Sequence, residues 1–190
     1  ATIARKSITV RAVTDDKPYD GSTGSALLPT IIGTLYEDYT SGQAFASRNV
    51  ALDGLGNELT GGVGIDPYLT FLDPADAANY QVTLEPTTGT IRQLVLTVST
   101  VLTSKVYDGS TGTTTLPLVT GTVIDGDTTA FTQRYSDPHV GATIPLILSG
   151  LVLDGNGGGN YRIVEDTSAT GAITIRPIPA KTASATNRDP

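Results

Sequence analysis

Short stretches of alternating apolar and polar residues recur along this chain, separated by turns rich in glycine, proline and aspartate. Residues 7–13 alternate in this way, which places Ile8, Val10 and Ala12 on one face, and residues 95–101 repeat the pattern. A period of two predicts half-buried β-strands. Further strands are predicted at residues 27–34, 80–84 and 116–122. The first and last of these ranges contain a proline, which favours an edge strand or a bent strand. The pattern therefore predicts an all-β protein.

One eight-residue segment occurs twice, and the chain is organised around it. Residues 17–24 read KPYDGSTG, and residues 105–112, which start 88 positions later, read KVYDGSTG. Such a match in a short chain predicts two copies of one structural repeat. In each copy the Asp-Gly pair predicts a turn, because glycine accepts a positive φ and an aspartate side chain bonds nearby backbone N–H groups. We expect the rings of Tyr19 and Tyr107 to lie at the edge of the core with their hydroxyls hydrogen-bonded.

An Asn-Tyr pair near the end of each repeat completes a structural signature. It is Asn79-Tyr80 in the first repeat and Asn160-Tyr161 in the second. The signature therefore consists, in each repeat, of a Lys, a Tyr, an Asp and a Gly from the first segment and this later Asn and Tyr: Lys17, Tyr19, Asp20, Gly21, Asn79, Tyr80, Lys105, Tyr107, Asp108, Gly109, Asn160 and Tyr161.

The segments that precede the two Asn-Tyr pairs differ in chemistry. In the first repeat Asp73 is predicted to cap one helical turn over residues 74–78, because Pro74 suits the first position of a helix. The second repeat has the glycine-rich segment 155–159 in this place.

The middle of the two repeats aligns less regularly. We align Ala44-Phe45 with Ala130-Phe131, and Asn49-Val50 with His139-Val140, which makes the segment after the phenylalanine four residues longer in the second repeat. Residues 52–68 exceed their counterpart by about nine residues. Insertions of this kind are expected in loops.

The repeats predict the domain boundaries. The first repeat covers residues 1–92, with residues 1–4 as the tail of a preceding unit; the second covers 93–176, and 177–190 form a junction to a following unit. Because the chain starts at Ala1 without methionine, we expect a fragment of a longer array. The predicted fold is two tandem antiparallel β-sandwiches, for which the family resemblance described below implies the immunoglobulin-like type, and the alternative is a β-grasp-like unit with one short helix.

Composition and charge exclude several classes of function. The net charge is −7 and no basic cluster occurs, which argues against nucleic acid and anionic membranes as partners. No apolar run approaches the roughly 20 residues of a membrane span. The chain has no cysteine, which excludes disulfides and cysteine-ligated metals.

Two sets of side chains suggest covalent chemistry. Ser136, Asp137 and His139 are the residue types of a hydrolytic triad, but they are neighbours in one segment, whereas triad residues converge from separate segments. We therefore expect no catalytic site and no enzyme. An isopeptide bond between Lys17 or Lys105 and a recurring asparagine, Asn79 or Asn160, is a further hypothesis, because a bond from lysine to asparagine can crosslink a domain that has no cysteine.

Calcium is the metal hypothesis. Asp154 and Asn156 provide oxygen ligands at positions 1 and 3 of a glycine-rich loop, and Glu165 falls at position 12, as in an EF-hand loop. The competing interpretation is a hairpin loop without metal, since no helix is predicted on either side. An acidic site that uses Asp15, Asp16 or Asp73 is a second calcium hypothesis. No other cofactor is expected.

The pattern Lys-x-Tyr-Asp-Gly-Ser-Thr, followed by Gly-Thr, an acidic turn, Asn-Tyr and a closing Ala/Thr-Ile, resembles the YDG repeat and the related MBG repeats. The resemblance covers residues 6–176. Such repeats occur in large secreted bacterial surface proteins, including filamentous-haemagglutinin-like adhesins. The resemblance implies an extracellular, tandem, immunoglobulin-like module that acts as a spacer in cell adhesion, with neighbouring repeats as its partners and no catalytic residue to carry over. Ala51 departs from the pattern, since the second repeat has Gly141 in the expected Val-Gly.

Two other functions stay open at this point. The first is a module that binds a glycan or a host protein through the unequal segments 52–68 and 132–139, with aromatic side chains available for stacking on sugars: Tyr36, Tyr39, Tyr68 and Tyr135. The second is association of like copies through edge strands; as a fragment, the chain is expected to be monomeric.

Overall fold

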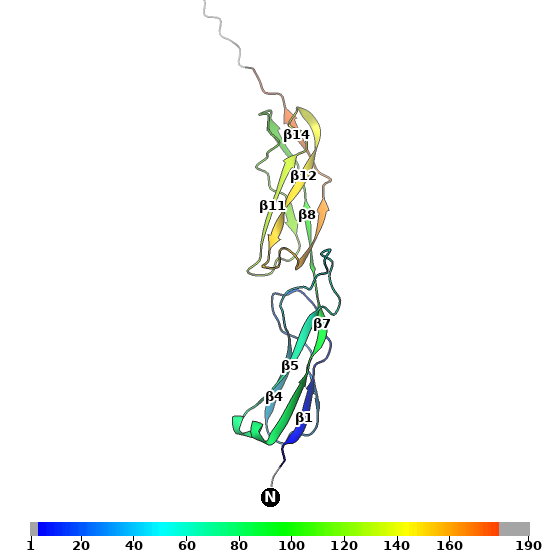
Figure 1. Cartoon of the computed structure of the whole chain (residues 1–190). Coiled ribbons are helices and arrows are strands. Elements are labelled where there is room, and N and C mark those ends of the chain that lie inside the picture. The colour runs from blue at the N-terminus through cyan, green and yellow to red at the C-terminus, as the bar shows by residue number, and fades with distance from the viewer. Residues whose placement is uncertain (1–3, 179–190) are drawn as a thin grey trace, which may run out of the picture. The chain divides into compact units, whose positions relative to one another are not determined.

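The computed structural model describes residues 4–178 and confirms an all-β fold, with 14 strands and one 3-10 helix in this range (Figure 1). Residues 1–3 of the predicted tail of a preceding unit and residues 179–190 of the predicted junction to a following unit lie outside the described residues. Within residues 4–178, no helix has the length and apolarity needed to cross a membrane. The elements are β1 (Lys6–Arg11), β2 (Asp16–Pro18), β3 (Thr30–Ile32), β4 (Tyr39–Phe45), β5 (Val63–Phe71), η1 (Pro74–Asn79), β6 (Tyr80–Glu85), β7 (Thr87–Arg92), β8 (Leu94–Ser99), β9 (Thr103–Val106), β10 (Leu118–Thr120), β11 (Thr128–Tyr135), β12 (Gly141–Leu153), β13 (Tyr161–Asp166) and β14 (Thr170–Thr174).

The chain divides into two compact units. Unit 1 consists of Ala1–Thr97, Thr120–Ala130 and Leu151–Val164, and unit 2 of Val98–Val119, Phe131–Gly150 and Glu165–Pro190. Unit 1 therefore contains the first repeat together with three segments of the second. The boundaries that follow the sequence repeats stay predictions.

Unit 1 contains two sheets with the strand orders β3-β1-β6 and β2-β7-β5-β4. β1 pairs antiparallel with β3 but parallel with β6, and β7 pairs antiparallel with β5 but parallel with β2. The expectation of purely antiparallel sheets is wrong. The long connections between the first and last strands of the repeat permit parallel pairing, which a short hairpin does not. The immunoglobulin-like topology stays a prediction.

The core of unit 1 joins the two sheets. Ile8 and Val10 of β1 pack with Phe71 of β5 and Tyr80 of β6, and the rings of Phe71 and Tyr80 stack with their centroids 5.0 Å apart. The predicted burial of one face of β1 is confirmed. On β6 the alternation predicted a strand correctly, but Val82 and Leu84 are exposed.

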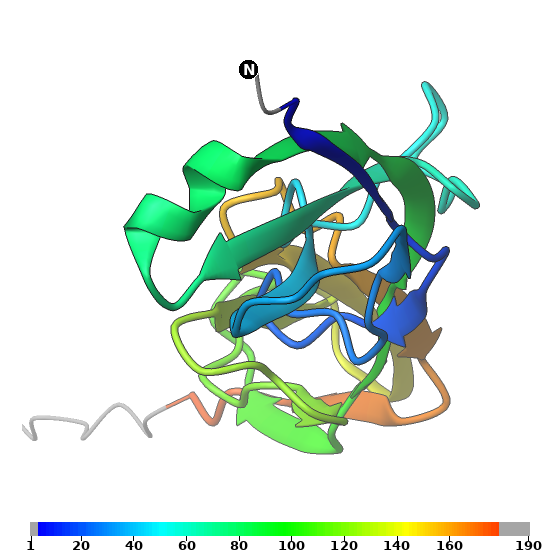
Figure 2. The same cartoon turned by 90° about the horizontal axis from the view of Figure 1, so that it is seen from below.

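Local signals at the edges and at the helix are confirmed. β3 and β10, which follow proline residues, both lie at sheet edges. Asp73 caps η1 by accepting a hydrogen bond from the Ala75 N–H at 2.9 Å, and Pro74 is at the start of the helix. Figure 2 shows η1 as the short green coil between β5 and β6.

Unit 2 has its own buried cluster, formed by Tyr135, Ile144, Leu146 and Ile173. Its strand β14 pairs parallel with β9 and antiparallel with β12. The remaining strand orders in the chain are β10-β8-β13 and β11-β12-β14-β9.

The structure corrects the alignment of the two repeats in their middle part. Gln43 and Gln133 are equivalent, because each buried amide exchanges two 2.8 Å hydrogen bonds with the backbone of one valine, Val13 or Val101. Phe45 is therefore equivalent to Tyr135, 90 residues later, and the four-residue insertion after Phe131 does not exist.

Tyr135 is consequently misplaced among the exposed aromatic candidates. Strand β11 continues through Tyr135, and its ring is fully buried in the cluster of unit 2. Its hydroxyl donates a hydrogen bond to the Ala172 carbonyl at 3.3 Å.

Candidate functional site

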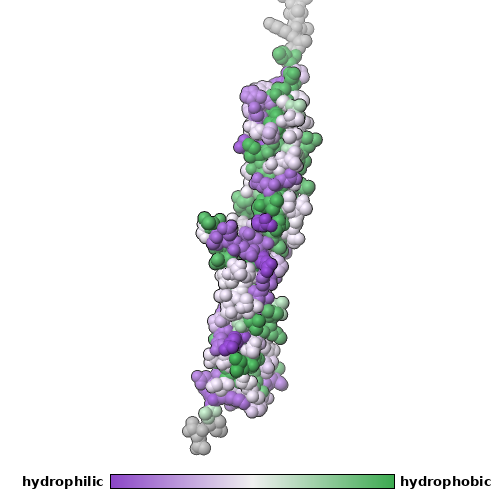
Figure 3. Space-filling view, turned by 90° about the vertical axis from the view of Figure 1, so that its right-hand side faces the viewer, coloured by the Kyte–Doolittle hydropathy of each residue, from purple (hydrophilic) through white to green (hydrophobic). Residues whose placement is uncertain are grey.

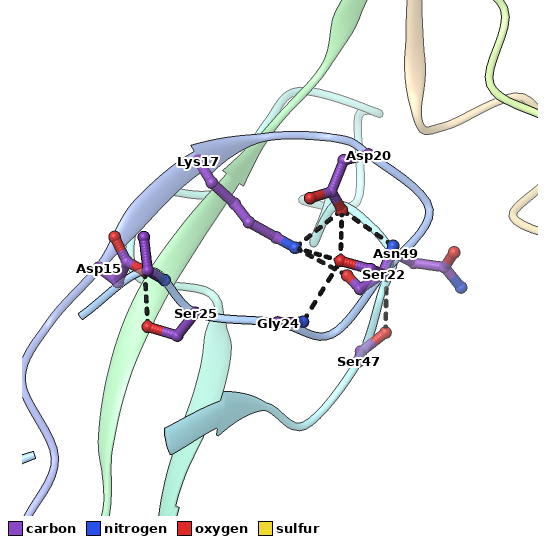
Figure 4. Close-up of polar contacts among 9 residues, drawn as sticks. Asp15, Lys17, Asp20, Ser22, Gly24, Ser25, Ser47 and Asn49 are labelled. Atoms are coloured by element: carbon purple, nitrogen blue, oxygen red, sulfur yellow. Dashed lines mark hydrogen bonds and ion pairs between the residues drawn. The ribbon is translucent and has the colours of Figure 1, made fainter. Parts of the chain in front are cut away.

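The repeated KxYDGS segment forms a closed turn around its lysine. The Lys17 Nζ donates to Asp20 Oδ1 at 2.8 Å, to the Ser22 carbonyl at 2.8 Å and to Ser22 Oγ at 3.2 Å (Figure 4). Asp20 Oδ1 also accepts hydrogen bonds from the backbone N–H and the hydroxyl of Ser22, each at 2.9 Å. Gly21 has a φ of +76°, which confirms the predicted turn and explains the glycine.

The second copy repeats this geometry. Lys105 Nζ donates to Asp108 Oδ1 at 2.8 Å and to the Ser110 carbonyl at 2.6 Å. The hydrogen bond from Lys105, together with those from Ser110, lowers the pKa of Asp108 to about 2. In Asp20, burial acts to raise the pKa, but the hydrogen bonds from Lys17 and Ser22 outweigh it and the pKa is lowered.

Each lysine also covers an aromatic ring of its own repeat. The Nζ atoms of Lys17 and Lys105 lie 5.3 Å from the ring centroids of Phe45 and Tyr135, respectively, within the range of a cation–π contact. The side chains of the two lysines are only 13% and 16% exposed. The turns therefore hold the amines of both lysines. The two asparagines of the isopeptide hypothesis have other surroundings: Asn79 is exposed, and Asn160 contacts Asn49 and Val50.

Tyr19 is the centre of a joint inside unit 1 between the first repeat and segments of the second. Its hydroxyl donates to Asp127 Oδ2 at 3.0 Å, and the Tyr161 hydroxyl donates to the same oxygen at 2.7 Å. The two rings meet edge to face with centroids 5.7 Å apart. The Tyr161 hydroxyl also accepts the Ile124 N–H at 2.9 Å. One carboxylate oxygen thus connects the signature tyrosines of the two repeats.

Burial and the Asp127 carboxylate both act to raise the pKa of Tyr19 and Tyr161. Burial, followed by the hydrogen bond to Asp127, raises the pKa of Tyr19. Burial is also the main cause that raises the pKa of Tyr161 to about 12, with a further contribution from Asp127. Both hydroxyls therefore stay protonated far above neutral pH and act as donors.

Asn160 forms the second part of the joint. Its side chain is fully buried, Oδ1 accepts the Val50 N–H at 2.9 Å, and Nδ2 donates to Asn49 Oδ1 at 3.1 Å. Asn156 Nδ2 donates to the Val50 carbonyl at 3.2 Å, so both backbone groups of Val50 are paired. The joint thus satisfies the polar groups that it buries.

Asp154, the first proposed calcium ligand, stabilises the loop that carries these asparagines. Its Oδ1 accepts the N–H groups of Asn156 and Gly158 at 2.7 and 2.8 Å, and its Oδ2 accepts that of Asn160 at 2.9 Å. Burial would raise the pKa of Asp154, but these backbone hydrogen bonds outweigh it and the pKa is lowered.

The other proposed calcium ligands have separate places. Asn156 contacts Val50, and Glu165 is exposed on β13 in unit 2. In the alternative set, Asp15 accepts hydrogen bonds from Ser25 and Ala26, and Asp16 pairs with Arg92. No group of three or more histidine, cysteine, aspartate or glutamate side chains suited to a metal was found in residues 4–178.

Equivalent signature residues in the two repeats differ in burial. Tyr19 is 1% exposed, but Tyr107 is 39% exposed, and within residues 4–178 its hydroxyl has no hydrogen bond. The expectation that Tyr107 lies at the core edge with a paired hydroxyl is therefore wrong. Tyr107 has the same position in its repeat as Tyr19 has in the first. Tyr19 contacts Asp127 and Tyr161, and Tyr107 has no counterpart of these two residues beside it in the described part of the chain.

Three aromatic candidates for ligand binding are exposed. Tyr36, Tyr39 and Tyr68 all present their rings to solvent, and Tyr68 lies across Gly42 of the neighbouring strand, where a Cβ would meet its hydroxyl. The Lys6 ammonium lies 4.1 Å from the ring centroid of Tyr36.

The Ser-Asp-His segment forms an exposed turn. The Asp137 Oδ1 accepts the His139 N–H at 2.8 Å and contacts the imidazole Nδ1. Ser47 and Asn49 form the same backbone turn in the first repeat, at 3.0 Å, which marks the segment as a common feature of both repeats. The described residues show no hydrogen bond between the Ser136 hydroxyl and His139.

Comparison with known proteins identifies part of the chain. Residues 92–170 match the family described as the YDG domain, so the chain contains a YDG-type domain in its second half. No curated protein and no solved structure matches the chain.

Proposed function

We propose that the chain is a non-enzymatic structural segment of a secreted bacterial surface protein of the adhesin type, in which consecutive repeats serve as a spacer. The joint around Tyr19, Asp127 and Tyr161 carries this proposal. A glycine- and serine-rich linker lets neighbouring domains reorient freely. A joint with buried rings and paired polar groups restricts that freedom and adds stability between neighbours, as in other repeat proteins.

The extent of unit 1 supports the same conclusion. Thr120–Ala130 and Leu151–Val164 belong to the second repeat, yet they are part of the compact unit that contains the first. The chemistry of the signature is also structural, because Lys17 and Asp20 pair with each other to close a turn. The match of residues 92–170 to the YDG domain also supports the proposal, because the resemblance to that family implies a spacer module.

The restriction of motion is measurable by pulsed electron paramagnetic resonance. Because the chain has no cysteine, two introduced cysteines at the exposed residues Gln81 and Thr129, one in each repeat and both in unit 1, would carry the only spin labels. We expect a narrow distribution of label distances that broadens in the double variant Tyr19→Ala/Asn160→Ala. Tyr107→Ala is the matched control and should leave the distribution narrow. A broad distribution in the otherwise native chain would refute the spacer mechanism.

The surface location has its own test. An antibody against the purified chain should label intact, unpermeabilised cells of the source bacterium. Labelling only after permeabilisation would contradict the proposed location without affecting the mechanics of the joint.

A further inference from the structure

The second repeat has a surface equivalent to the one that the first repeat buries in the joint. We call it the docking face and define it by Val106, Tyr107, Gly109, Val140 and Ile175, all in unit 2. Val140 is the equivalent of Val50, and the two are 51% and 3% exposed, as Tyr107 and Tyr19 are 39% and 1%. Residues that are core-like in the first repeat are thus open to solvent in the second.

Glycine packing shows the same difference. Gly21 and Gly109 have similar backbone conformations, with φ values of +76° and +80°. A Cβ on Gly21 would lie 2.9 Å from Ile124 Cγ2, whereas a Cβ on Gly109 would meet no atom within 4 Å. The turn of the second repeat is therefore formed in the same way but has no neighbour against it.

The docking face includes an apolar hollow. A hollow of about 420 Å³ lies between the start of β12 and the end of β14, with Val140, Ile173 and Ile175 in its lining. Ile178, which follows Ile173 by five residues as Leu96 follows Ile91, is almost fully exposed, while Leu96 is buried. Figure 3 shows hydrophobic residues (green) at this C-terminal end of the described chain. Uncovered apolar surface of this kind indicates an interaction site.

The complementary surface is present at the other end of the repeat. In the first repeat the Tyr80 hydroxyl donates to Glu37 Oε2 at 2.6 Å and accepts the Tyr36 N–H at 3.0 Å. This matches the arrangement of Tyr161, Asp127 and the Ile124 N–H in the joint. A hollow of about 400 Å³ lies beside it, lined in part by Tyr36, Glu37, Asn79 and Tyr80. A repeat of this type therefore presents a carboxylate–tyrosine pair and an asparagine at its N-terminal end.

We propose that the docking face binds the N-terminal end of a further repeat of the same type, as the first repeat binds the second. The carboxylate of that repeat accepts the Tyr107 hydroxyl, its Asn-Tyr tyrosine meets the Tyr107 ring edge to face, and its asparagine accepts the Val140 N–H. This inference rests on the proposed structural function and names the surface through which the array grows.

An extended chain tests the inference. Residues 1–176 are followed by a copy of residues 95–190, so that Val95 follows Arg176 as it follows Leu94 in the native joint and Ile175 is retained. The added copy carries Tyr107→Phe, which leaves Tyr107 of the middle repeat as the single tyrosine of its type. Nitration by tetranitromethane, quantified on peptides by mass spectrometry, reports the accessibility of each tyrosine.

We expect the nitration rate of Tyr107 to fall, relative to the original chain, to the rate of Tyr19 in the same sample. The exposed Tyr36 should be unchanged, and the buried Tyr135 copies should stay protected, which shows that the added repeat has folded. With Asp127→Ala in the added copy, Tyr107 should regain reactivity. Unchanged Tyr107 nitration in the extended chain, or protection that survives Asp127→Ala, would overturn the inference. Neither outcome touches the spin-label test of the native joint, so the two proposals fail separately.

Discussion

Removing one hydroxyl at the joint should cost stability, whereas removing its equivalent at the docking face should not. The variants are Tyr19→Phe and Tyr107→Phe, which delete one oxygen each from residues at equivalent positions. The Tyr19 hydroxyl donates to Asp127 at 3.0 Å and is buried, while Tyr107 has no such bond in the described chain. The pair therefore compares one substitution in two surroundings.

The magnitude follows from the hydrogen bond that is lost. A hydrogen bond to a charged group contributes about 1.5–3 kcal/mol. Asp127 is only partly buried and keeps its 2.7 Å bond from Tyr161, which favours the lower end of that range. We expect Tyr19→Phe to lower the free energy of unfolding by about 1–2 kcal/mol. Tyr107→Phe, an exposed change, should stay within about 0.5 kcal/mol of the native value.

Urea unfolding, followed by far-ultraviolet circular dichroism and tyrosine fluorescence, measures both values. With a slope of about 2 kcal/mol/M, in the middle of the usual range for urea, the midpoint for Tyr19→Phe should move by roughly 0.5–1 M. A double-mutant cycle of Tyr19→Phe with Asp127→Asn should give a coupling of about 1 kcal/mol, since the two groups share one bond. Equal losses for the two phenylalanine variants would refute the role given to the joint.

Three further predictions concern the ionisation of the joint, its glycine packing and the asparagine-bearing loop. Burial raises the pKa of Tyr161 from 10.0 to about 12, so its contribution to stability is complete below pH 10 and is lost as the pH rises through 12; an ultraviolet tyrosinate titration should show this late phase, and Tyr161→Phe should remove it. Gly21→Ala and Gly109→Ala share the strain of a positive φ, but only Gly21→Ala also meets Ile124, so it should lower the thermal midpoint further; equal midpoints would contradict the packing argument. Asp154→Ala should cost about 2–3 kcal/mol by leaving backbone N–H groups unpaired, and since its oxygens already accept three such bonds, calcium should not raise the melting temperature of the native chain; a calcium-dependent rise that Asp154→Ala abolishes would restore the metal hypothesis.

Local patterns were sufficient to predict much of the fold. The alternation at residues 7–13 predicted β1 and its buried face, and the Asp73-Pro74 pair predicted the start of η1. These features depend on neighbours in sequence. Parallel pairing of β1 with β6 joins strands that are far apart in the chain, and alternation within either strand carries no information about its partner's direction.

The sequence contains a signal for the correct alignment of the two repeats in their middle part. Matching Ala44-Phe45 with Ala130-Phe131 rested on identical residues, but the spacing from Gln43 to Val50 equals that from Gln133 to Val140. The glutamine is the more constrained residue, because its amide must pair with both backbone groups of a valine. Phenylalanine and tyrosine exchange freely beneath a lysine, since either ring offers it an aromatic face.

The loop at Asp154 shows why a ligand pattern can describe a loop without a metal. Aspartate and asparagine among glycines suit calcium coordination and equally suit a turn in which the carboxylate accepts backbone N–H groups. The choice depends on where two oxygen atoms point, and here they point at three N–H groups of the loop itself. That loop then places Asn160 against Val50, so the aspartate acts on the joint through the asparagine.

Nearly identical segments have different roles in this chain because their surroundings differ. The KxYDGS turn closes on itself in both repeats through its lysine, and this part is encoded locally. Whether its tyrosine is buried depends on residues about 108 positions away for Tyr19, which reaches Asp127 from another repeat. A motif of this kind specifies half of a contact, and burial of Tyr107 requires the other half, a carboxylate and a tyrosine at the N-terminal end of a neighbour.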